Sequence, residues 1–371
     1  MKIKAFITHK AAEQYVDCQD RFTINPDNRT IAVSDGISQS LHSKIWADIL
    51  TKEFVKQPWG INETDSFASV HEKFSQEWRS SVENSQGRVS ESARFFTERM
   101  LAEGRSAGAT FLGVQFDVLK WNGTVLGDSC LIEIRDNENL EIYTSQEGGH
   151  FNFTPDYYDS DPNKPGNGKE KQISGELAPG VTLLLVSDPF SDFFAENRAK
   201  ASGYIKELCE LKTHEEYISL VDRWRKEYKM HNDDSTIVII EYDGSNDFII
   251  EHQDDIEELI KIEREEKEQN KTETTQSTSN APWNRPKIPS GNTAVLNSDA
   301  KEEFCEKFLS AAEQTYIGKR DSQNNRRKSF KRFTKWDKKR QKVNESLTEK
   351  KKTLRKLLEP ILEEYTIQKK Q

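Results

Sequence analysis

The sequence predicts an α+β domain in which antiparallel sheets are covered on their outer faces by helices, with a helical extension at the C-terminal end. Most strand candidates are joined by short polar turns, and strands and helices do not alternate as they do in a parallel βαβ fold. Hydrophobic residues make up 34% of the 371 residues and charged residues 32%, so part of the chain is expected to lie outside any core.

The strand candidates are short apolar or β-branched runs bounded by turn residues. In chain order they are Lys4–Thr8, Thr30–Ser34, Thr110–Trp121, Thr124–Ile134, Leu140–Thr144, Val181–Val186 and Thr236–Tyr242. Asn122-Gly123 is a typical hairpin turn and is expected to separate two of these strands. Helical periodicity is found in Lys44–Phe54, Phe67–Glu83 and Thr213–Lys229. The polar segment Gln146–Gln172 is predicted to be a long surface loop.

Composition divides the chain into four segments. They are a compact domain at 1–244, a charged helix at 245–271, a flexible linker at 272–298 and a basic helical tail at 299–371. Residues 281–371 contain 23 Lys+Arg and 12 Asp+Glu, a net charge of +11, while the remaining residues have a net charge of −20. Such opposed charges indicate two functional units, which dock on each other or on a third molecule.

The basic tail contains three aromatic residues, Phe330, Phe333 and Trp336, spaced so that they share one face of a helix. A solvated helix that pairs with Ala300–Tyr316, or that rests on the acidic domain, is one interpretation. Docking of a protein partner or autoinhibition is a second. Nucleic-acid binding is a third, and it is disfavoured because no base-reading motif is present.

The longest apolar run, Val181–Val186, is too short to span a bilayer, and no signal-peptide pattern is found at the first residues. The cysteines Cys18, Cys130, Cys209 and Cys305 show no metal-ligand spacing. A cytoplasmic protein without a membrane partner is therefore expected.

Aspartates lie at the ends of the apolar strands. They are Asp20, Asp35, Asp128, Asp188 and Asp233. Each alone is explained as an ordinary turn residue, because Asp is common at strand ends. As a set, converging carboxylates would repel one another without a cation, and oxygen ligands suit Mg²⁺ or Mn²⁺. The set therefore predicts a divalent metal site at one edge of the sheets.

Six segments resemble, in order, the type 2C metal-dependent serine/threonine protein phosphatases, in particular the bacterial members. The segments are Thr8–Asp20, Ala32–Gly36, Ser106–Val114, Gly127–Ser129, Leu183–Asp192 and Asp233–Ile240. The resemblance covers about two-thirds of the chain. It implies a four-layer α-β-β-α sandwich of two antiparallel sheets flanked by helices, with the metal site at one edge.

The resemblance also implies roles for individual residues. Asp35 would bridge two ions, Mn²⁺ or Mg²⁺, and Asp188 and Asp233 would complete the ligands of the first. The carbonyl of Gly36 and the carboxylate of Asp20 would hold the second ion. Asp128 would bind a third ion or support the others. A hydroxide bridging the metals would then attack the phosphorus of phosphoserine or phosphothreonine.

Three positions depart from the family pattern. Pro189 replaces the glycine after the third aspartate, and it fixes φ and removes a donor. Ile37 stands where some members have a general-acid histidine, and Tyr15 where many have a phosphate-contacting arginine. His9, as a catalytic candidate, and Lys10 are the nearby substitutes.

The resemblance implies a phosphorylated protein substrate and a cognate Ser/Thr kinase. The alternative function is a weak or inactive phosphatase-like module that binds phosphoproteins, with the basic tail docking a partner or nucleic acid. The departures favour this alternative, and the retained aspartates favour the enzyme.

Overall fold

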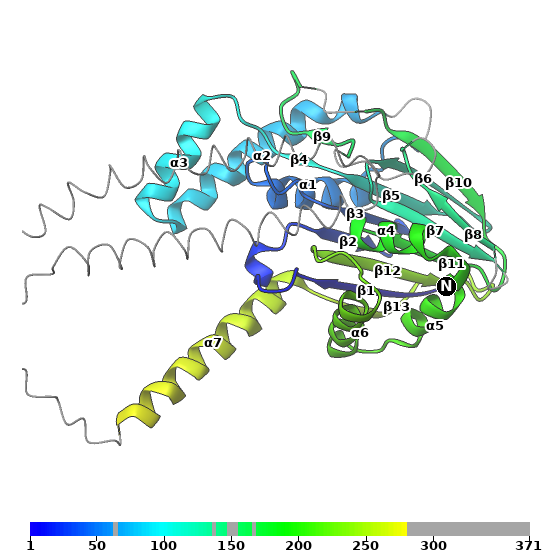
Figure 1. Cartoon of the computed structure of the whole chain (residues 1–371). Helices are drawn as coiled ribbons and strands as arrows, with labels where there is room; N and C mark the ends of the chain where they lie inside the picture. Colours follow the sequence, from blue (N-terminus) through cyan, green and yellow to red (C-terminus); the bar gives the residue numbers. More distant parts are fainter. Residues whose placement is uncertain (62–65, 136–138, 147–154, 165–167, 280–371) are drawn as a thin grey trace, which may run out of the picture. The chain divides into compact units, whose positions relative to one another are not determined.

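The computed structural model describes residues 1–61, 66–135, 139–146, 155–164 and 168–279 (Figure 1). Its first sheet has the strand order β13-β1-β12-β11-β7-β8. These strands are β1 (Lys2–Thr8), β7 (Cys130–Arg135), β8 (Asn139–Tyr143), β11 (Thr182–Val186), β12 (Ser235–Glu241) and β13 (Ile249–Gln253). All neighbours are antiparallel except β1 and β13, which are parallel.

The second sheet is antiparallel, with the order β10-β6-β5-β3-β2. Its strands are β2 (Arg21–Asn25), β3 (Thr30–Ser34), β5 (Phe111–Phe116), β6 (Lys120–Leu126) and β10 (Lys171–Glu176). A short pair, β4 (Gly108–Ala109) and β9 (Tyr158–Asp159), lies beside it. The helices are α1 (Ser43–Lys56), α2 (His71–Ser85), α3 (Glu91–Ala102), α4 (Asp188–Glu196), α5 (Ala201–Glu210), α6 (His214–Glu227) and α7 (Ile256–Ser279).

Strand alternation separates three apolar cores and so produces four layers. In β12, Val238 and Ile240 face the core between the sheets, whereas Ile237 and Ile239 face α4, α5 and α6. On the other side, α1 and α2 cover the second sheet through a third core. Helices thus lie on both outer faces of the paired sheets (Figure 1). Because both faces of the central strands are buried, β11 and β12 carry continuous apolar runs, Leu183–Val186 and Ile237–Ile240. The predicted α+β sandwich is confirmed.

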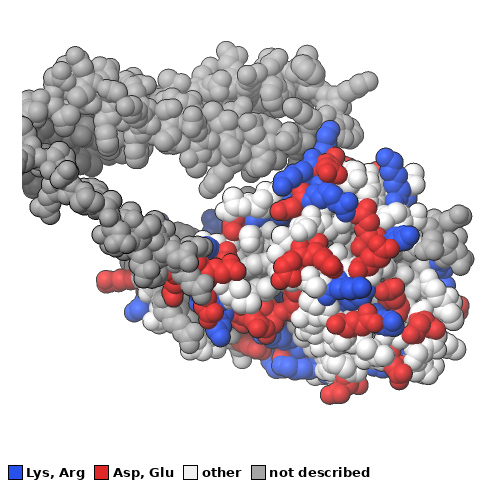
Figure 2. Space-filling model, turned by 90° about the horizontal axis from the view of Figure 1, so that it is seen from below, with Lys and Arg blue, Asp and Glu red and all other residues white. Residues whose placement is uncertain are grey.

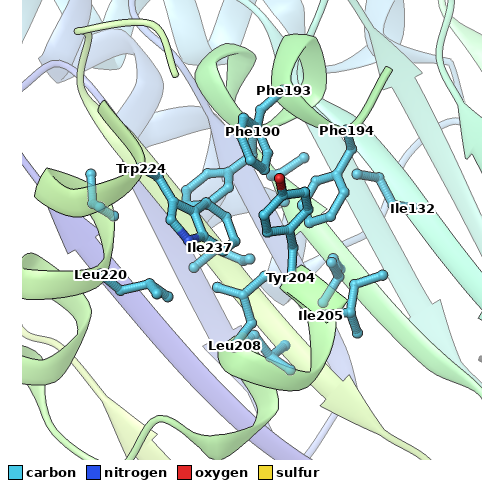
Figure 3. Packing of buried hydrophobic residues seen from close by; sticks show 14 of the residues in the cluster. Ile132, Phe190, Phe193, Phe194, Tyr204, Ile205, Leu208, Leu220, Trp224 and Ile237 are labelled. Atoms are coloured by element: carbon cyan, nitrogen blue, oxygen red, sulfur yellow. The ribbon is translucent and has the colours of Figure 1, made fainter. Parts of the chain in front are cut away.

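The core beneath the first sheet is rich in aromatic residues. Phe193 of α4 stacks on Trp224 of α6, with ring centroids 4.7 Å apart, and Tyr204 of α5 packs edge-on against both. Figure 3 shows these rings packed against one another and against Ile237 of β12. The start of α6 is fixed by a capping box between Thr213 and Glu216. These contacts anchor the helix layer to the sheet whose edge bears the candidate site.

Asn122-Gly123 does not form a turn, contrary to the sequence prediction. Both residues lie within β6, where Gly123 pairs with Val114, and the chain turns instead at Asp117–Leu119. A Cβ atom on Gly123 would lie 2.6 Å from the carbonyl oxygen of Gly113. The glycine is therefore needed for close strand packing rather than for a turn.

The charged helix begins at a later residue than the sequence indicates. Residues 249–253 form β13 beside β1, so the sheet continues past residue 244. The charged helix α7 then runs from Ile256 to Ser279, into the segment predicted to be a linker. The rest of the linker and the basic tail at 299–371 lie outside the described residues.

The predicted loop Gln146–Gln172 contains two strand segments, β9 and the start of β10. Tyr158 is buried in the third core, where its ring stacks on Phe67 at 3.9 Å. This aromatic residue therefore packs inside the domain.

Candidate metal centre

The predicted carboxylates lie where strands of both sheets end at one edge. Asp35 follows β3, Asp188 follows β11 and begins α4, and Asp233 precedes β12. The strand pairing brings these ends together, because Val186 is opposite Ile237 in the first sheet and Ser34 is opposite Arg21 in the second. Asp20 directly precedes β2 at the same edge. Asp128 lies in the crossing between β6 of the second sheet and β7 of the first.

Burial, and then repulsion by neighbouring carboxylates, raise the pKa values of Asp20, Asp35 and Asp188. Burial raises the pKa of Asp35 well above its usual value, and the charges of the other four predicted aspartates raise it further. Burial followed by the charges of Asp128 and Asp233 does the same to the pKa of Asp188. For Asp20, which is fully buried, burial is the main cause of a raised pKa and the nearby Asp234 is the second. The aspartates that the sequence predicts therefore form one electrostatically coupled group.

Buried hydroxyl groups hold the strand ends that carry this group. The hydroxyl of Ser34 donates to the carbonyl of Thr110 at 2.6 Å, and the hydroxyls of Thr110 and Ser129 are 2.7 Å apart. Across the edge, the hydroxyl of Ser191 in α4 donates to the carbonyl of Asp128 at 2.7 Å. The backbone that carries the carboxylates is therefore fixed by the protein itself.

Asp234, which the sequence analysis did not single out, ties down the loop that leads to Asp20. Its Oδ1 accepts the backbone N–H of Lys10 at 3.0 Å, and its Oδ2 accepts that of Gln19 at 2.8 Å. One nearly buried carboxylate thus fixes both ends of the segment between β1 and Asp20. The signal in the sequence is the second aspartate of the pair Asp233-Asp234.

His231 also joins the group, and sequence reasoning missed it. Its imidazole, with Asp188 and Asp233, presents potential ligand atoms that all lie within 4.8 Å of one another. The only sequence signal is a histidine two positions before Asp233 in the turn that leads into a buried strand. Such spacing is not specific by itself, so the arrangement becomes visible only in the fold.

Gly36 lies beside Asp35 and is tightly packed. Its N–H donates to the carbonyl of Gln19 at 3.3 Å, and a Cβ atom here would lie 2.9 Å from Ser43. Only glycine fits without displacing the first turn of α1. Its predicted role as a carbonyl ligand stays a prediction.

His9 packs edge-on against Tyr15 at 4.6 Å, and its Nδ1 lies 2.9 Å from the carbonyl of Lys10. Tyr15 is buried, and its hydroxyl lies 2.7 Å from Nε2 of His214. Burial, more than any other cause, raises the pKa of Tyr15 to about 12, so this side chain brings no charge to the position of the family's arginine.

Lys10 brings the positive charge that Tyr15 lacks. Its Nζ lies 3.3 Å from Oδ1 of Asp233 and 3.7 Å from Glu13. Burial lowers the pKa of Lys10, but the nearby carboxylates of Asp233, Asp234 and Glu13 together outweigh it, so the net shift is upward. The ammonium group therefore stays charged at the border of the carboxylate group.

Pro189 is compatible with the site, because it occupies the first turn of α4. A proline in this position loses no helical hydrogen bond, and its fixed φ suits the start of a helix. The departure that appears disruptive in the sequence therefore leaves Asp188 at the N-terminal end of a regular helix.

The donor set suits a hard divalent cation, since clustered carboxylates with raised pKa values become stable as anions when an ion neutralises them. A two-sheet sandwich with such a group at one edge is the architecture of a metal-dependent protein phosphatase. The model of the protein phosphatase 2C family matches residues 9–224, more than half of the chain. The chain belongs to this family of metal-dependent protein phosphatases.

Solved structures of bacterial phosphatases resemble the chain at low identity. A bacterial serine phosphatase is 15% identical and covers 64% of this chain and 96% of its own, with a TM-score of 0.41. Stp1 from Staphylococcus aureus is 15% identical, and the match covers 65% of this chain and 94% of Stp1, with a TM-score of 0.42. The catalytic domain of PstP, in complex with two manganese ions, is 14% identical. The match covers 64% of this chain and 96% of the PstP domain, with a TM-score of 0.39. No curated protein matches the chain.

Within the part of the chain that the structure describes, no helix has both the length and the apolar character needed to cross a membrane.

Proposed function

We propose that this protein hydrolyses phosphoserine and phosphothreonine in proteins, using divalent ions held at the edge of the two sheets. The observation that supports this most is the convergence of Asp35, Asp188 and their neighbours, because burial first, and then the charges of the neighbouring aspartates, raise the pKa values of Asp35 and Asp188. Buried like charges are costly unless a cation compensates them. The family match adds the class of reaction.

In this proposal, Asp35 would be a ligand to two ions, Mn²⁺ or Mg²⁺, and Asp188 and Asp233 would complete the ligands of the first. The carbonyl of Gly36 and the carboxylate of Asp20 would hold the second ion, and Asp128 would hold a third. When bound, such ions would activate water as a nucleophile near neutral pH and would neutralise charge on the phosphoryl oxygens.

The side chains around the ions position the substrate. Lys10, at 3.3 Å from Asp233, is placed to contact the phosphoryl oxygens in place of the family's arginine. His9 is the candidate for donating a proton to the leaving serine or threonine oxygen. Because Asp234 fixes both ends of their loop, these side chains are presented from a rigid backbone.

The proposal includes a phosphorylated protein as substrate and a Ser/Thr kinase that acts on the same target, in a bacterial cytoplasm. Acidic side chains gather in several patches on the face of the described domain drawn in Figure 2. We extend the proposal to residues 299–371, a basic helical tail that docks an acidic surface, either on a protein partner or on the catalytic domain.

A second candidate function is a phosphoprotein-binding module with little turnover. The neutral, buried Tyr15 at the position of the phosphate-contacting arginine favours it. In this function the carboxylates and their ions would bind a phosphate group without hydrolysing its ester.

Hydrolysis of a phosphothreonine peptide and of an aryl phosphate separates the two candidates. Wild type, Asp35→Asn and the control Asp27→Asn, an exposed turn aspartate, are assayed with Mn²⁺ and with a chelator. We expect Mn²⁺-dependent turnover in wild type and in the control, and none in Asp35→Asn. Folded wild type that binds Mn²⁺ and the phosphopeptide without turnover would contradict the enzyme and support the binding module.

A further inference from the structure

His231 lies at the metal edge, in the turn that precedes β12. Its potential ligand atom lies within 4.8 Å of those of Asp188 and Asp233. Ligands around an ion with bonds of about 2.1 Å are separated by roughly 3 to 4 Å. Small side-chain rotations would therefore bring the three groups to a common ion. The side chains of His231 and Asp233 are 25% and 29% exposed, so an ion from solvent can reach them.

The two carboxylate oxygens of Asp233 have different neighbours. Oδ1 accepts the N–H of Asp234 at 3.1 Å and lies 3.3 Å from Nζ of Lys10. Oδ2 instead lies 4.0 Å from Nδ1 of His231. One oxygen thus orients the carboxylate, and the other is directed toward the imidazole. This is the arrangement expected when Oδ2 and a ring nitrogen share an ion.

The backbone between the two residues is also fixed. The N–H of Asp233 donates to the carbonyl of His231 at 3.2 Å, which closes a tight turn. The guanidinium of Arg225 donates to the carbonyl of Asp233 at 2.7 Å and to the hydroxyl of Ser235 at 3.0 Å. His231 and Asp233 are therefore presented from one rigid turn.

We propose that His231 supplies a nitrogen ligand to the divalent ion that Asp188 and Asp233 bind. The inference rests on the metal centre of the proposed function, and it makes one ion position a mixed oxygen and nitrogen site. An imidazole ligand suits Fe, Ni, Cu and Zn best, is weaker for Mn²⁺, the first metal of that series, and is least suited to Mg²⁺, which prefers oxygen ligands. This position therefore selects Mn²⁺ or a later transition metal over Mg²⁺.

Pulsed electron paramagnetic resonance of Mn²⁺ tests the ligand directly, without an activity assay. The full-length protein is freed of metal and loaded with less than one equivalent of Mn²⁺. We expect ¹⁴N modulation from a coordinated imidazole in wild type, its loss in His231→Gln and its retention in His9→Gln. The second variant is a matched control, because it makes the same substitution at the histidine of the neighbouring loop.

Metal titrations of the same proteins test the selectivity. Removing the nitrogen ligand should weaken Mn²⁺ binding by about tenfold or more. A loss of this size is typical even when the mutated residue only hydrogen-bonds a metal ligand. Mg²⁺ affinity should change less, so the preference for Mn²⁺ narrows in His231→Gln. A preference that stays as wide as in wild type would overturn the inference.

Selective ¹⁵N labelling of histidine in wild type gives a measurement that needs no variant, because the ¹⁴N modulation must then disappear. Bound Mn²⁺ without nitrogen modulation in wild type overturns the role of His231 and leaves the proposed phosphatase intact. Modulation that survives in His231→Gln, or that is lost in His9→Gln, also overturns it. Wild type that binds no Mn²⁺ overturns the metal centre, and the proposed function with it.

Discussion

The two ends of α4 serve opposite purposes within a few residues. At its first residue, Asp188 enters a group of carboxylates that repel one another. From two residues further on, Phe190, Phe193 and Phe194 are buried among the aromatic residues of α5 and α6 (Figure 3). The carboxylates destabilise the fold unless a bound cation neutralises them, whereas packing of the aromatic core stabilises the fold. A rigid core is what allows repelling side chains to stay together.

The largest effect is expected for Asp188→Asn. Metal ions supply several kcal/mol of transition-state stabilisation, so weakening their site should lower kcat/KM for a phosphothreonine peptide by about 10³-fold. In chelator the same variant should be more stable than wild type by about 1 kcal/mol, because one repelling charge is gone. Urea unfolding and peptide hydrolysis measure the two quantities. Equal stability in chelator would mean that the edge is not strained.

Phe194→Ala tests the other end of the same helix. Truncating a fully buried phenylalanine should lower the free energy of unfolding by about 3–5 kcal/mol. Activity per folded molecule should change by less than about twofold, because the ring does not reach the carboxylates. Phe194→Leu removes fewer buried atoms, so it should lower the free energy of unfolding by a smaller amount. A fall in activity at temperatures where both variants are fully folded would show that core and edge are coupled.

The pH dependence of stability should separate chelated from Mn²⁺-loaded protein. Asp20, Asp35 and Asp188 have folded-state pKa values above the usual 3.8, so the chelated folded protein binds more protons than the unfolded chain in that range. Their contribution to stability is therefore lost as pH rises through the raised pKa values. Near pH 8, Mn²⁺ at about 100 times its Kd should raise the free energy of unfolding by about 2.7 kcal/mol. Near about pH 4 it should not change the free energy of unfolding, because the carboxyl groups are protonated.

Melting curves from about pH 4 to about pH 8 check this, with Asp188→Asn as the comparison that removes one titrating carboxylate and its repulsion of Asp35. The difference between wild type and variant should grow with pH in chelator. A difference independent of pH would show that the carboxylates do not oppose one another.

Local patterns in the sequence could predict antiparallel sheets with helices on their outer faces and aspartates at the strand ends, whereas the four-layer sandwich was implied by the family resemblance. Apolar runs mark the strands, and a polar residue that follows such a run lies where the strand ends. Asp234 and His231 could not be recognised in this way, since their importance depends on which loops the fold brings beside them. Asn122-Gly123 was misread for a similar reason. Close contact with Gly113 explains that glycine, and only the sheet pairing shows it.

The smallest effect is expected for Lys10, the edge's own positive charge. Lys10→Met should raise KM for the phosphopeptide by about tenfold, the value of one charge-assisted contact, and change kcat less. Lys10→Arg should recover most of the loss, because a guanidinium also contacts phosphate. Lys52→Met, at an exposed position of α1, is the matched control and should leave both constants unchanged.

Lys10→Met also tests whether the ammonium group of Lys10 both stabilises the metal-free protein and contacts the phosphopeptide. Its Nζ lies 3.3 Å from Oδ1 of Asp233, so Lys10→Met should lower the stability of the chelated protein as well as the affinity for the phosphopeptide. With Mn²⁺ bound, the stability loss should shrink, because the ion then neutralises the same carboxylate. If Lys10→Met lowers stability equally with and without Mn²⁺ and leaves KM unchanged, Lys10 is a structural partner of Asp233 and does not contact the phosphoryl group.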